Sequence, residues 1–322
     1  MRALLSLVII IAVLVGVGRF AQAQQPAKVP RIGILANGTP TGNVNRAAFL
    51  KGLRELGYIE GKNIIIEYRS ANRQSDLLPG LAAELVDLGV SVIVPSGPTA
   101  IRPAMKATKT IPIVMPNGGG NPVRRGFVKS LTWPGGNVTG ISLINKGLGF
   151  KIMELLHEAF PWVSRVVVLN PVREPRMKEY KQGAAMLGLD FQSVRVHKPK
   201  DFEQAFSTVT ELKPEALIVI RNTLTLHSAG QIAEFAIRRR LISTGNLHPL
   251  VRKGGLMAYG FDYLASWHRA ATFVDKILKG ANPADLPVEP ARLKFMINLT
   301  TARKIGVTIP PEILLEANEV IK

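Results

Sequence analysis

Short apolar runs alternate with amphipathic segments along nearly the whole chain, and this alternation limits the fold more than any other feature. Between the runs lie segments with leucines three or four residues apart, as expected for helices with one apolar face. Strands that alternate with helices predict a parallel sheet covered by helices on both faces. Strands are expected at residues 31–36, 64–68, 90–94, 113–115, 166–169, 189–196, 216–220 and 293–297. A single helix is expected at residues 226–239.

Residues 111–141 mark a passage between two such α/β units. The stretch starts with an apolar strand, continues through a loop rich in glycine and asparagine, and ends in a turn that leads to another strand. A second crossing is expected near Met257. We therefore predict an α/β fold of two doubly wound parallel-sheet lobes joined by several hinge crossovers. One lobe would hold residues 24–139 and about 258–283, and the other residues 140–257 and about 284–322.

The length and composition support two globular lobes. The chain has 322 residues, of which 47% are hydrophobic and 20% charged, so it is long enough for two cores and too apolar for a disordered chain. Its N-terminus resembles an export signal: Arg2, an apolar run over residues 3–17, and small residues at Ala21 and Ala23. We expect cleavage after Ala23. An uncleaved membrane anchor is the alternative, because the run is nearly long enough to span a bilayer.

The absence of cysteine narrows the function classes. It excludes disulfides, a thiol nucleophile, thiolate metal sites and the cysteine of a lipoprotein anchor, so an exported chain of this kind is expected to be free in the periplasm. The net charge is +18, and loss of Arg2 and Arg19 with the signal would leave +16. These charges are scattered, which argues against nucleic acid and favours an anionic partner or a membrane surface.

Catalytic and metal-binding motifs are missing. The sequence has no dinucleotide or phosphate-binding glycine motif and no nucleophile elbow. None of its five histidines pairs with another at the spacing of metal ligands. We therefore expect no enzyme activity, no cofactor and no metal.

Polar residues follow the predicted strands, at the edge where open α/β sheets bind ligands. The turn at residues 96–99 is the sharpest of these features, because two hydroxyls and free N–H groups at a helix start suit a carboxylate. The expected ligand-binding residues are Asn37, Thr39, Ser96, Gly97, Thr99, Asn117, Asn121, Asn170, Asn222, Asn246, Tyr259 and Asp262.

Each of these features has a structural alternative. Ser96 and Thr99 are also suited to cap the helix that follows them. The asparagines are also typical of turns. Tyr259 and Trp267 are suited either to stack on a ligand or to pack in a core, and the helical position of Trp267 favours packing.

Several motifs together resemble the periplasmic substrate-binding proteins of ABC transporters of the TrpX-like type. The resemblance covers essentially the whole mature chain and implies the type I periplasmic-binding-protein fold. It implies two lobes that close on a small, amino-acid-like solute and deliver it to a membrane permease and its ATPase. The motifs lie at residues 31–35, 49–58, 60–64, 81–85, 96–100, 111–114, 134–140, 254–260, 274–280 and 283–288.

The chain departs from the family pattern at the predicted ligand-binding edge. Asn121 stands where the family has an aspartate, His248-Pro249 replaces an Arg-Glu pair, and Asn222 stands near another usual aspartate. Losing these acidic groups weakens the prediction of a ligand amine, although Asp262 remains available for one.

The sequence therefore predicts a monomeric periplasmic solute-binding protein that works by hinge closure. Two other classes stay open. A ligand-sensing ectodomain would bind solute equally well but signal to a membrane sensor. A secreted α/β enzyme would need a nucleophile and base that the sequence does not reveal.

Overall fold

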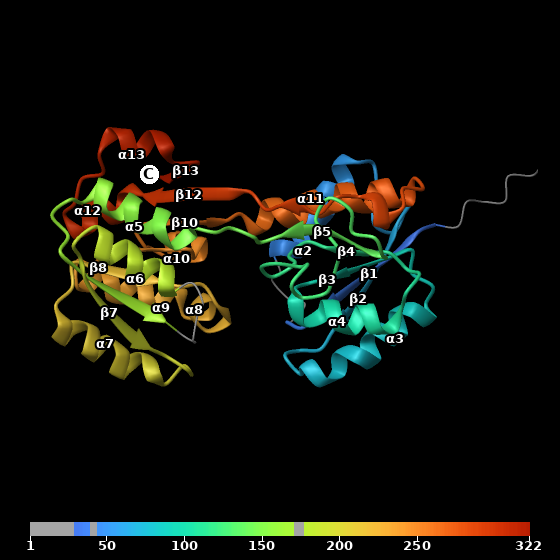
Figure 1. Cartoon of the computed structure of the whole chain (residues 1–322), viewed down its shortest axis with the longest axis horizontal. Helices are drawn as coiled ribbons and strands as arrows, with labels where there is room; N and C mark the ends of the chain where they lie inside the picture. Colours follow the sequence, from blue (N-terminus) through green and yellow to red (C-terminus); the bar gives the residue numbers. More distant parts are fainter. Residues whose placement is uncertain (1–28, 39–43, 171–176) are drawn as a thin grey trace, which may run out of the picture.

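The computed structural model describes residues 29–38, 44–170 and 177–322. The predicted signal peptide (residues 1–23) and Thr39 lie outside these ranges. Within them, no helix combines the length and the apolar character needed to cross a membrane. The described chain forms three sheets, and Figure 1 shows its elements in two groups side by side along the long axis.

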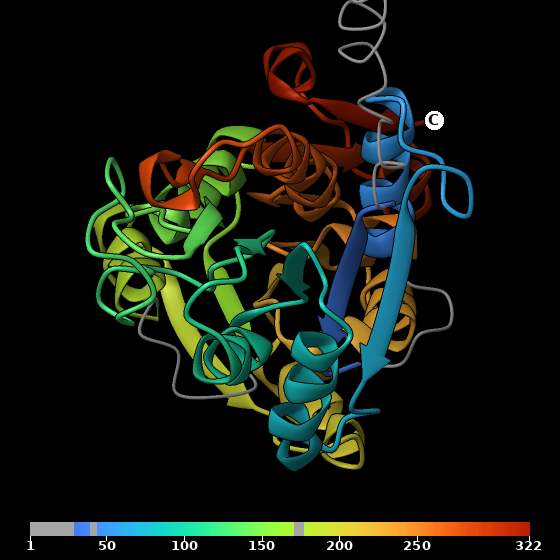
Figure 2. The same ribbon diagram turned by 90° about the vertical axis from the view of Figure 1, so that its right-hand side faces the viewer.

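The first lobe is built on a six-stranded sheet in the order β11-β5-β4-β3-β1-β2, and all its strand pairs are parallel. Figure 2 shows β1 and β2 side by side at one edge. The strands are β1 (Arg31–Ala36), β2 (Ile65–Ser70), β3 (Val92–Pro95), β4 (Ile113–Met115), β5 (Val138–Ser142) and β11 (Glu289–Pro290).

Helices cover both faces of this sheet because side chains along each strand alternate between two cores. Ile93 belongs to the core shared with α3 and α4, whereas Val92 and Val94 belong to the core shared with α2 and α11. The helical elements are α2 (Val44–Glu55), η1 (Ser75–Leu77), α3 (Leu78–Asp87), α4 (Pro98–Ala107), α11 (Tyr263–Leu278) and η2 (Pro283–Asp285).

The second lobe holds a four-stranded parallel sheet in the order β7-β6-β8-β9 and a three-stranded sheet in the order β10-β12-β13. The strands are β6 (Arg165–Asn170), β7 (Asp190–Arg195), β8 (Ala216–Val219), β9 (Ile242–Gly245), β10 (Met257–Phe261), β12 (Leu293–Asn298) and β13 (Glu319–Ile321).

The helices of the second lobe also cover two faces. α7 and α9 share one core with β6 and β8, and α5 and α6 share the other. The helices are α5 (Leu148–Ala159), α6 (Met177–Met186), α7 (Asp201–Leu212), α8 (Thr223–His227), α9 (Ala229–Arg238), α10 (His248–Arg252), α12 (Leu299–Ile305) and α13 (Pro311–Glu316).

Two details differ from the predicted elements. β12 lies at the predicted position but runs antiparallel to β10, because the chain leaves along β10, forms α11 in the first lobe and returns. The single helix expected between residues 226 and 239 is two helices. A capping box between Asn222 and Thr225 starts α8 early, and Ser228 separates α8 from α9.

The chain passes between the lobes three times, at residues 143–147, at Asp262 and at residues 291–292. We propose these crossings as the lobe boundaries. Each lies a few residues C-terminal to the boundary expected from the sequence. In Figure 1 the strands of the two parallel sheets point toward each other, so the carboxyl ends of both sheets face the region between the lobes.

Candidate functional site

The candidate site consists of the turns that follow the strands of the two facing sheets. One contact joins them directly: Arg73 Nη2, after β2, lies 2.8 Å from His227 Nε2 at the end of α8. His227 Nδ1 lies 2.6 Å from the carbonyl oxygen of Thr223 and must donate to it. In this tautomer Nε2 accepts from Arg73, so one pair of side chains spans the distance between the two edges.

The turn between β3 and α4 is the central part of the first lobe's edge. Gly97 is the N-cap of α4, with φ 156° and ψ −178°, a backbone conformation that residues with side chains rarely adopt. No side chain caps this helix. The Ser96 hydroxyl instead accepts from the Asn37 N–H at 3.4 Å, and Thr99 is exposed. The structure therefore does not show the capping roles that were the alternative for these two hydroxyls.

The loop after β4 lies against the start of α4. Gly119 has φ 61°, and a Cβ there would lie 1.9 Å from Cγ of Pro98. The Asn117 side chain shapes this loop by accepting from the Gly119 N–H at 3.0 Å. Asn121 accepts from the N–H groups of two following residues in the same manner. Both asparagine side chains thus shape the turns of this loop through their Oδ1 atoms.

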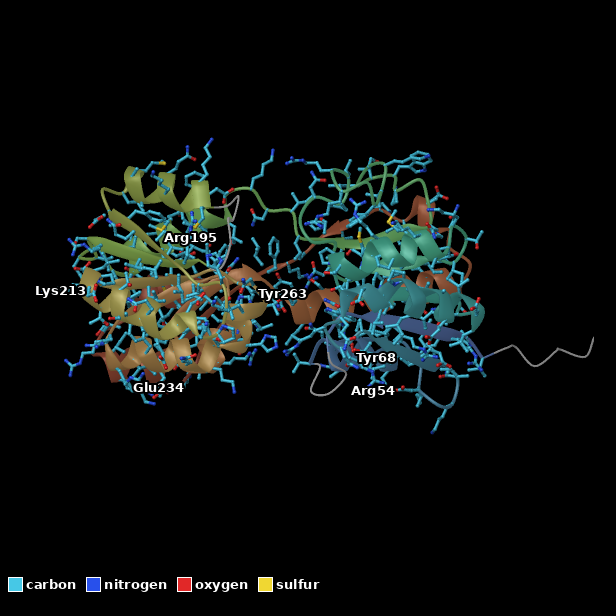
Figure 3. The ribbon with its side chains drawn as sticks, turned by 90° about the horizontal axis from the view of Figure 1, so that it is seen from below. Arg54, Tyr68, Arg195, Lys213, Glu234 and Tyr263 are labelled. Carbon is cyan, nitrogen blue, oxygen red and sulfur yellow. The ribbon has the colours of Figure 1, made fainter. Side chains whose placement is uncertain are left out.

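In the second lobe, Arg221 and two asparagines follow β8 and β9. Asn222 caps α8 and accepts from the Thr225 N–H at 2.8 Å. Asn246 is only 5% exposed, and its Oδ1 accepts from the Arg221 N–H at 2.6 Å. The Arg221 guanidinium lies over the ring of Tyr263, with Cζ 3.7 Å from the ring centroid. Figure 3 shows Tyr263 at the junction of the two lobes.

The turn after β10 places Asp262 beside His248 and Lys294. Asp262 caps α11, because its Oδ1 accepts from the Ala265 N–H at 2.9 Å, and its Oδ2 lies 4.0 Å from Lys294 Nζ. Burial lowers the pKa of His248, while its hydrogen bond to the Lys294 carbonyl oxygen and the charge of Asp262 act in the opposite direction. His248 is therefore neutral at pH 7 and donates through Nε2.

Within the described ranges, the structure gives no contact at the facing edges for Tyr259, Trp267 and Asn170. Tyr259 packs edge-on against Phe295 at 6.2 Å, and Trp267 is fully buried in the first lobe. Asn170 ends β6 at the same sheet edge as Asn222, but its side chain lies outside the described structure. Sequence reasoning missed Arg221 and Tyr263 as site residues. The available signal for Arg221 was its position as the first polar residue after a buried strand.

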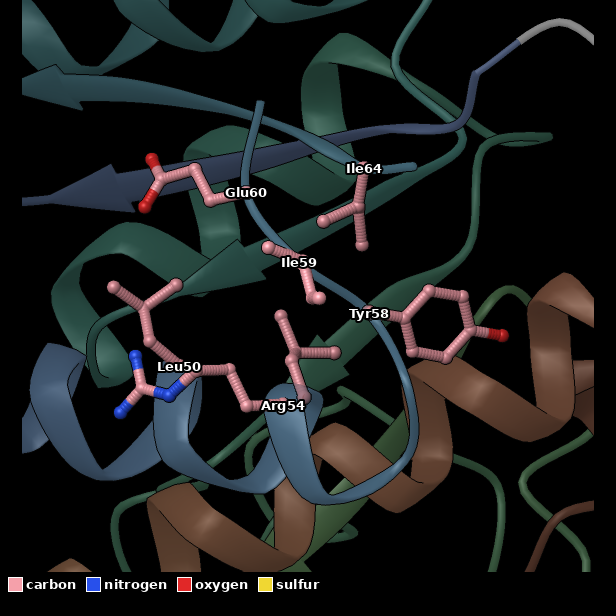
Figure 4. Close-up of a pocket in the computed structure, with 7 residues that line it drawn as sticks. Leu50, Arg54, Tyr58, Ile59, Glu60 and Ile64 are labelled. Carbon is pink, nitrogen blue, oxygen red and sulfur yellow. The ribbon is translucent and has the colours of Figure 1, made fainter. Parts of the chain in front are cut away.

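Three hollows in the described residues lie away from these facing edges. The one in Figure 4, about 160 Å³, sits between α2 and the segment before β2, at the amino end of the strands and below the usual size of a ligand site. A larger one of about 480 Å³ lies beside the crossings, where Arg269 is paired with Glu289 at 2.7 Å and His268 with Glu55 at 2.7 Å, and Arg292 also lines it. The third, about 230 Å³, lies at the outer end of α7.

No group of three or more histidine, aspartate or glutamate residues in the described ranges is arranged to hold a metal ion. The polar groups at the facing edges are instead amides, hydroxyls, backbone N–H groups, the guanidinium groups of Arg73 and Arg221, and the carboxylate of Asp262. The donors among these groups are suited to hold an organic molecule with a carboxylate.

Comparison with known proteins identifies the family of this chain. The family model for ABC transporter substrate binding proteins matches residues 39–321. The chain belongs to this family. Its members are binding proteins rather than enzymes, which accounts for the absence of catalytic motifs in the sequence.

A tyrosine-binding protein and a tryptophan-bound structure are each 26% identical to this chain. A tyrosine-binding protein of Clostridioides difficile (strain R20291) is 26% identical over 276 residues, which cover 83% of this chain and 78% of that protein. The solved structure of an ABC domain in complex with L-Trp from Streptococcus pneumonia has a TM-score of 0.76 at 26% identity and covers 91% of this chain and 99% of that one.

A conserved domain protein of Vibrio cholerae has the same TM-score of 0.76 at 27% identity, with 91% and 100% coverage. Leucine-binding and sugar-binding proteins at much lower identity share the fold alone. The substrate-binding protein described here therefore has the type I periplasmic-binding-protein fold.

Proposed function

We propose that this substrate-binding protein is the solute receptor of an ABC importer and binds an amino-acid-like or carboxylate-bearing ligand between its lobes. The observation that carries the proposal is the meeting of two parallel-sheet edges, with the 96–99 turn on one and Arg221 and Tyr263 on the other. The names of the two relatives support a ligand with an aromatic group, since one binds tyrosine and the other was solved with tryptophan.

Hinge closure is the proposed mechanism. The ligand's carboxylate binds at Ser96, Thr99 and the N–H groups at the start of α4, and the part of the ligand next to the carboxylate meets Arg221 and Tyr263 in the second lobe. A ligand that touches both edges stabilises the closed form more than the open form and shifts the population toward it. The three crossings are the segments that absorb the change of backbone angle.

The proposed setting is the periplasm, reached through cleavage after Ala23, with the mature protein acting as a monomer. Its partners are a membrane permease and the permease's ATPase, which receive the ligand from the closed form. No nucleic-acid partner and no cofactor enters this proposal.

The decisive experiment identifies the ligand. Mass spectrometry of small molecules released from the purified protein, followed by calorimetry with a panel of amino acids and aromatic acids, is expected to yield at least one carboxylate bound in a 1:1 ratio and recovered unchanged. A ligand that emerged chemically altered, or no binding anywhere in the panel together with an empty purified protein, would contradict the proposed function.

A further inference from the structure

Arg221 carries a positive charge that the described structure leaves unpaired. Its side chain forms no hydrogen bond and no ion pair with any described residue, and it is half-buried. The ring of Tyr263 lies 3.7 Å away and supports the guanidinium plane, while Asn246 holds the Arg221 backbone N–H at 2.6 Å. The guanidinium is therefore held in place by stacking, and its five donors remain available to a ligand.

The two carboxylates of the second lobe that lie around Lys294 are already in use. Asp262 caps α11 through Oδ1, and its Oδ2 lies 4.0 Å from Lys294 Nζ. Glu319 lies 2.5 Å from Lys294 Nζ and 2.9 Å from Arg252 Nη2. Each of these two carboxylates thus lies near a cation other than Arg221. Arg221 therefore has no carboxylate partner among the described residues.

A ligand ammonium group would be disfavoured here. It would approach Arg221 and Lys294, and like charges at short range in a partly desolvated site repel. His248 is neutral, and its Nε2–H is used by the Lys294 carbonyl oxygen. On the first lobe, the described turns after β1, β3 and β4 offer amides and hydroxyls but no carboxylate, and the one carboxylate after β2, Asp76 of η1, is exposed. Among the described residues, then, neither edge holds a buried, uncommitted anion to receive an ammonium.

We propose that the ligand is an organic carboxylate without an ammonium group, such as an aromatic 2-oxo or 2-hydroxy acid, and that Arg221 selects for it. This inference rests on the proposed function, because it names the class of ligand bound between the lobes. Arg221 would donate to an anionic or carbonyl oxygen through its bidentate fork, and its repulsion of ammonium would reject the matching amino acid.

Matched pairs of ligands test the selection directly. Calorimetry would compare tryptophan with indole-3-pyruvate, tyrosine with 4-hydroxyphenylpyruvate, and leucine with 4-methyl-2-oxopentanoate. We expect the oxo acid of the binding pair to bind at least about 10-fold more tightly than its amino acid. Equal or tighter binding of the amino acid overturns this inference and leaves the proposed function intact. Failure of every pair and of the wider panel contradicts the proposed function instead.

Variants of Arg221 test its part in the selection. Arg221→Gln is expected to weaken oxo-acid binding about 10- to 100-fold and to remove the preference over the amino acid, while Arg221→Lys keeps part of it. Arg303→Gln, on α12 of the same lobe, is the matched control and should change neither affinity. If Arg221 were only structural, both ligands would lose affinity equally. An unchanged ratio of the two affinities in Arg221→Gln, with the melting temperature retained, therefore overturns the assignment.

Discussion

At the scale of a single residue, Gly119 allows the loop after β4 to pack against the start of α4. It has φ 61°, and a Cβ would lie 1.9 Å from Cγ of Pro98, whereas a Cβ on Gly120 (φ 88°) would meet nothing within 4 Å. Both alanine variants carry the strain of a left-handed backbone, about 1–2 kcal/mol. Only Gly119→Ala also displaces the start of α4.

We therefore expect Gly119→Ala to lower the free energy of unfolding by about 1–3 kcal/mol more than Gly120→Ala, as for other overpacked sites, and to weaken ligand binding. Urea denaturation and calorimetry measure the two effects. Equal stability of the two variants would show that the loop moves away from Pro98 without cost.

Ser96 and Thr99 give a second prediction at this scale. Because neither hydroxyl caps α4, removing both should leave the melting temperature of the empty protein close to that of the wild type. The double variant Ser96→Ala, Thr99→Ala should weaken binding by about 1–3 kcal/mol, as for lost hydrogen bonds to a charged group. Ser207→Ala, on the exposed face of α7, is the control. Unchanged affinity in the double variant would remove this turn from the site.

His248 predicts a dependence of stability on pH. Burial lowers its pKa in the folded protein below the ordinary value of 6.5, so the unfolded chain binds more protons between the two values. The contribution of the neutral ring to stability is present above pH 6.5 and is lost as the pH falls through the lower folded-state value. Urea midpoints from pH 5 to pH 8 should fall toward acid, and His248→Gln should flatten that part of the profile. An identical profile in the variant would contradict this reading of the buried ring.

At the scale of elements, the caps explain why several polar residues follow strands. Asp262 caps the 16-residue helix α11 and Asn222 caps α8, so these side chains begin helices at the sheet edge. Asp262→Ala should lower the free energy of unfolding by about 0.5–2 kcal/mol, whereas Asp262→Asn keeps an acceptor for the Ala265 N–H and should cost much less. Chemical denaturation distinguishes the two. If both variants lost stability equally, the lost stability would come from removing the negative charge near Lys294 rather than from losing the helix cap.

Most helices and strands were predictable because their signals are local. The runs at residues 31–36 and 113–115 are strands as expected, since short apolar runs between turn residues are typical of buried parallel strands. The antiparallel direction of β12 was not predictable, because it depends on the path of the chain through α11 in the other lobe. The division between α8 and α9 was missed because one apolar stripe runs through both.

At the scale of the whole molecule, ligand binding is expected to bring the lobes together. The chain has no cysteine, so fluorophores attach only where one is introduced. A pair at Lys62 in the first lobe and Met186 in the second, both exposed, should gain energy transfer when ligand is added. A pair at Met186 and Leu315, both in the second lobe and 80% and 88% exposed, should not change. An unchanged signal from the first pair at saturating ligand would contradict hinge closure.

The sequence by itself determined the α/β class, the order of elements and the family, because hydrophobic periodicity, turn residues and motifs are properties of neighbouring residues. It also located the turns after the strands where the candidate site lies. Only the tertiary structure decided which of those side chains form hydrogen bonds to nearby backbone groups and which remain available to a ligand. Arg221 over Tyr263 and Arg73 beside His227 join residues far apart in the chain, and such contacts follow from the packing of two cores and three crossings rather than from any local pattern.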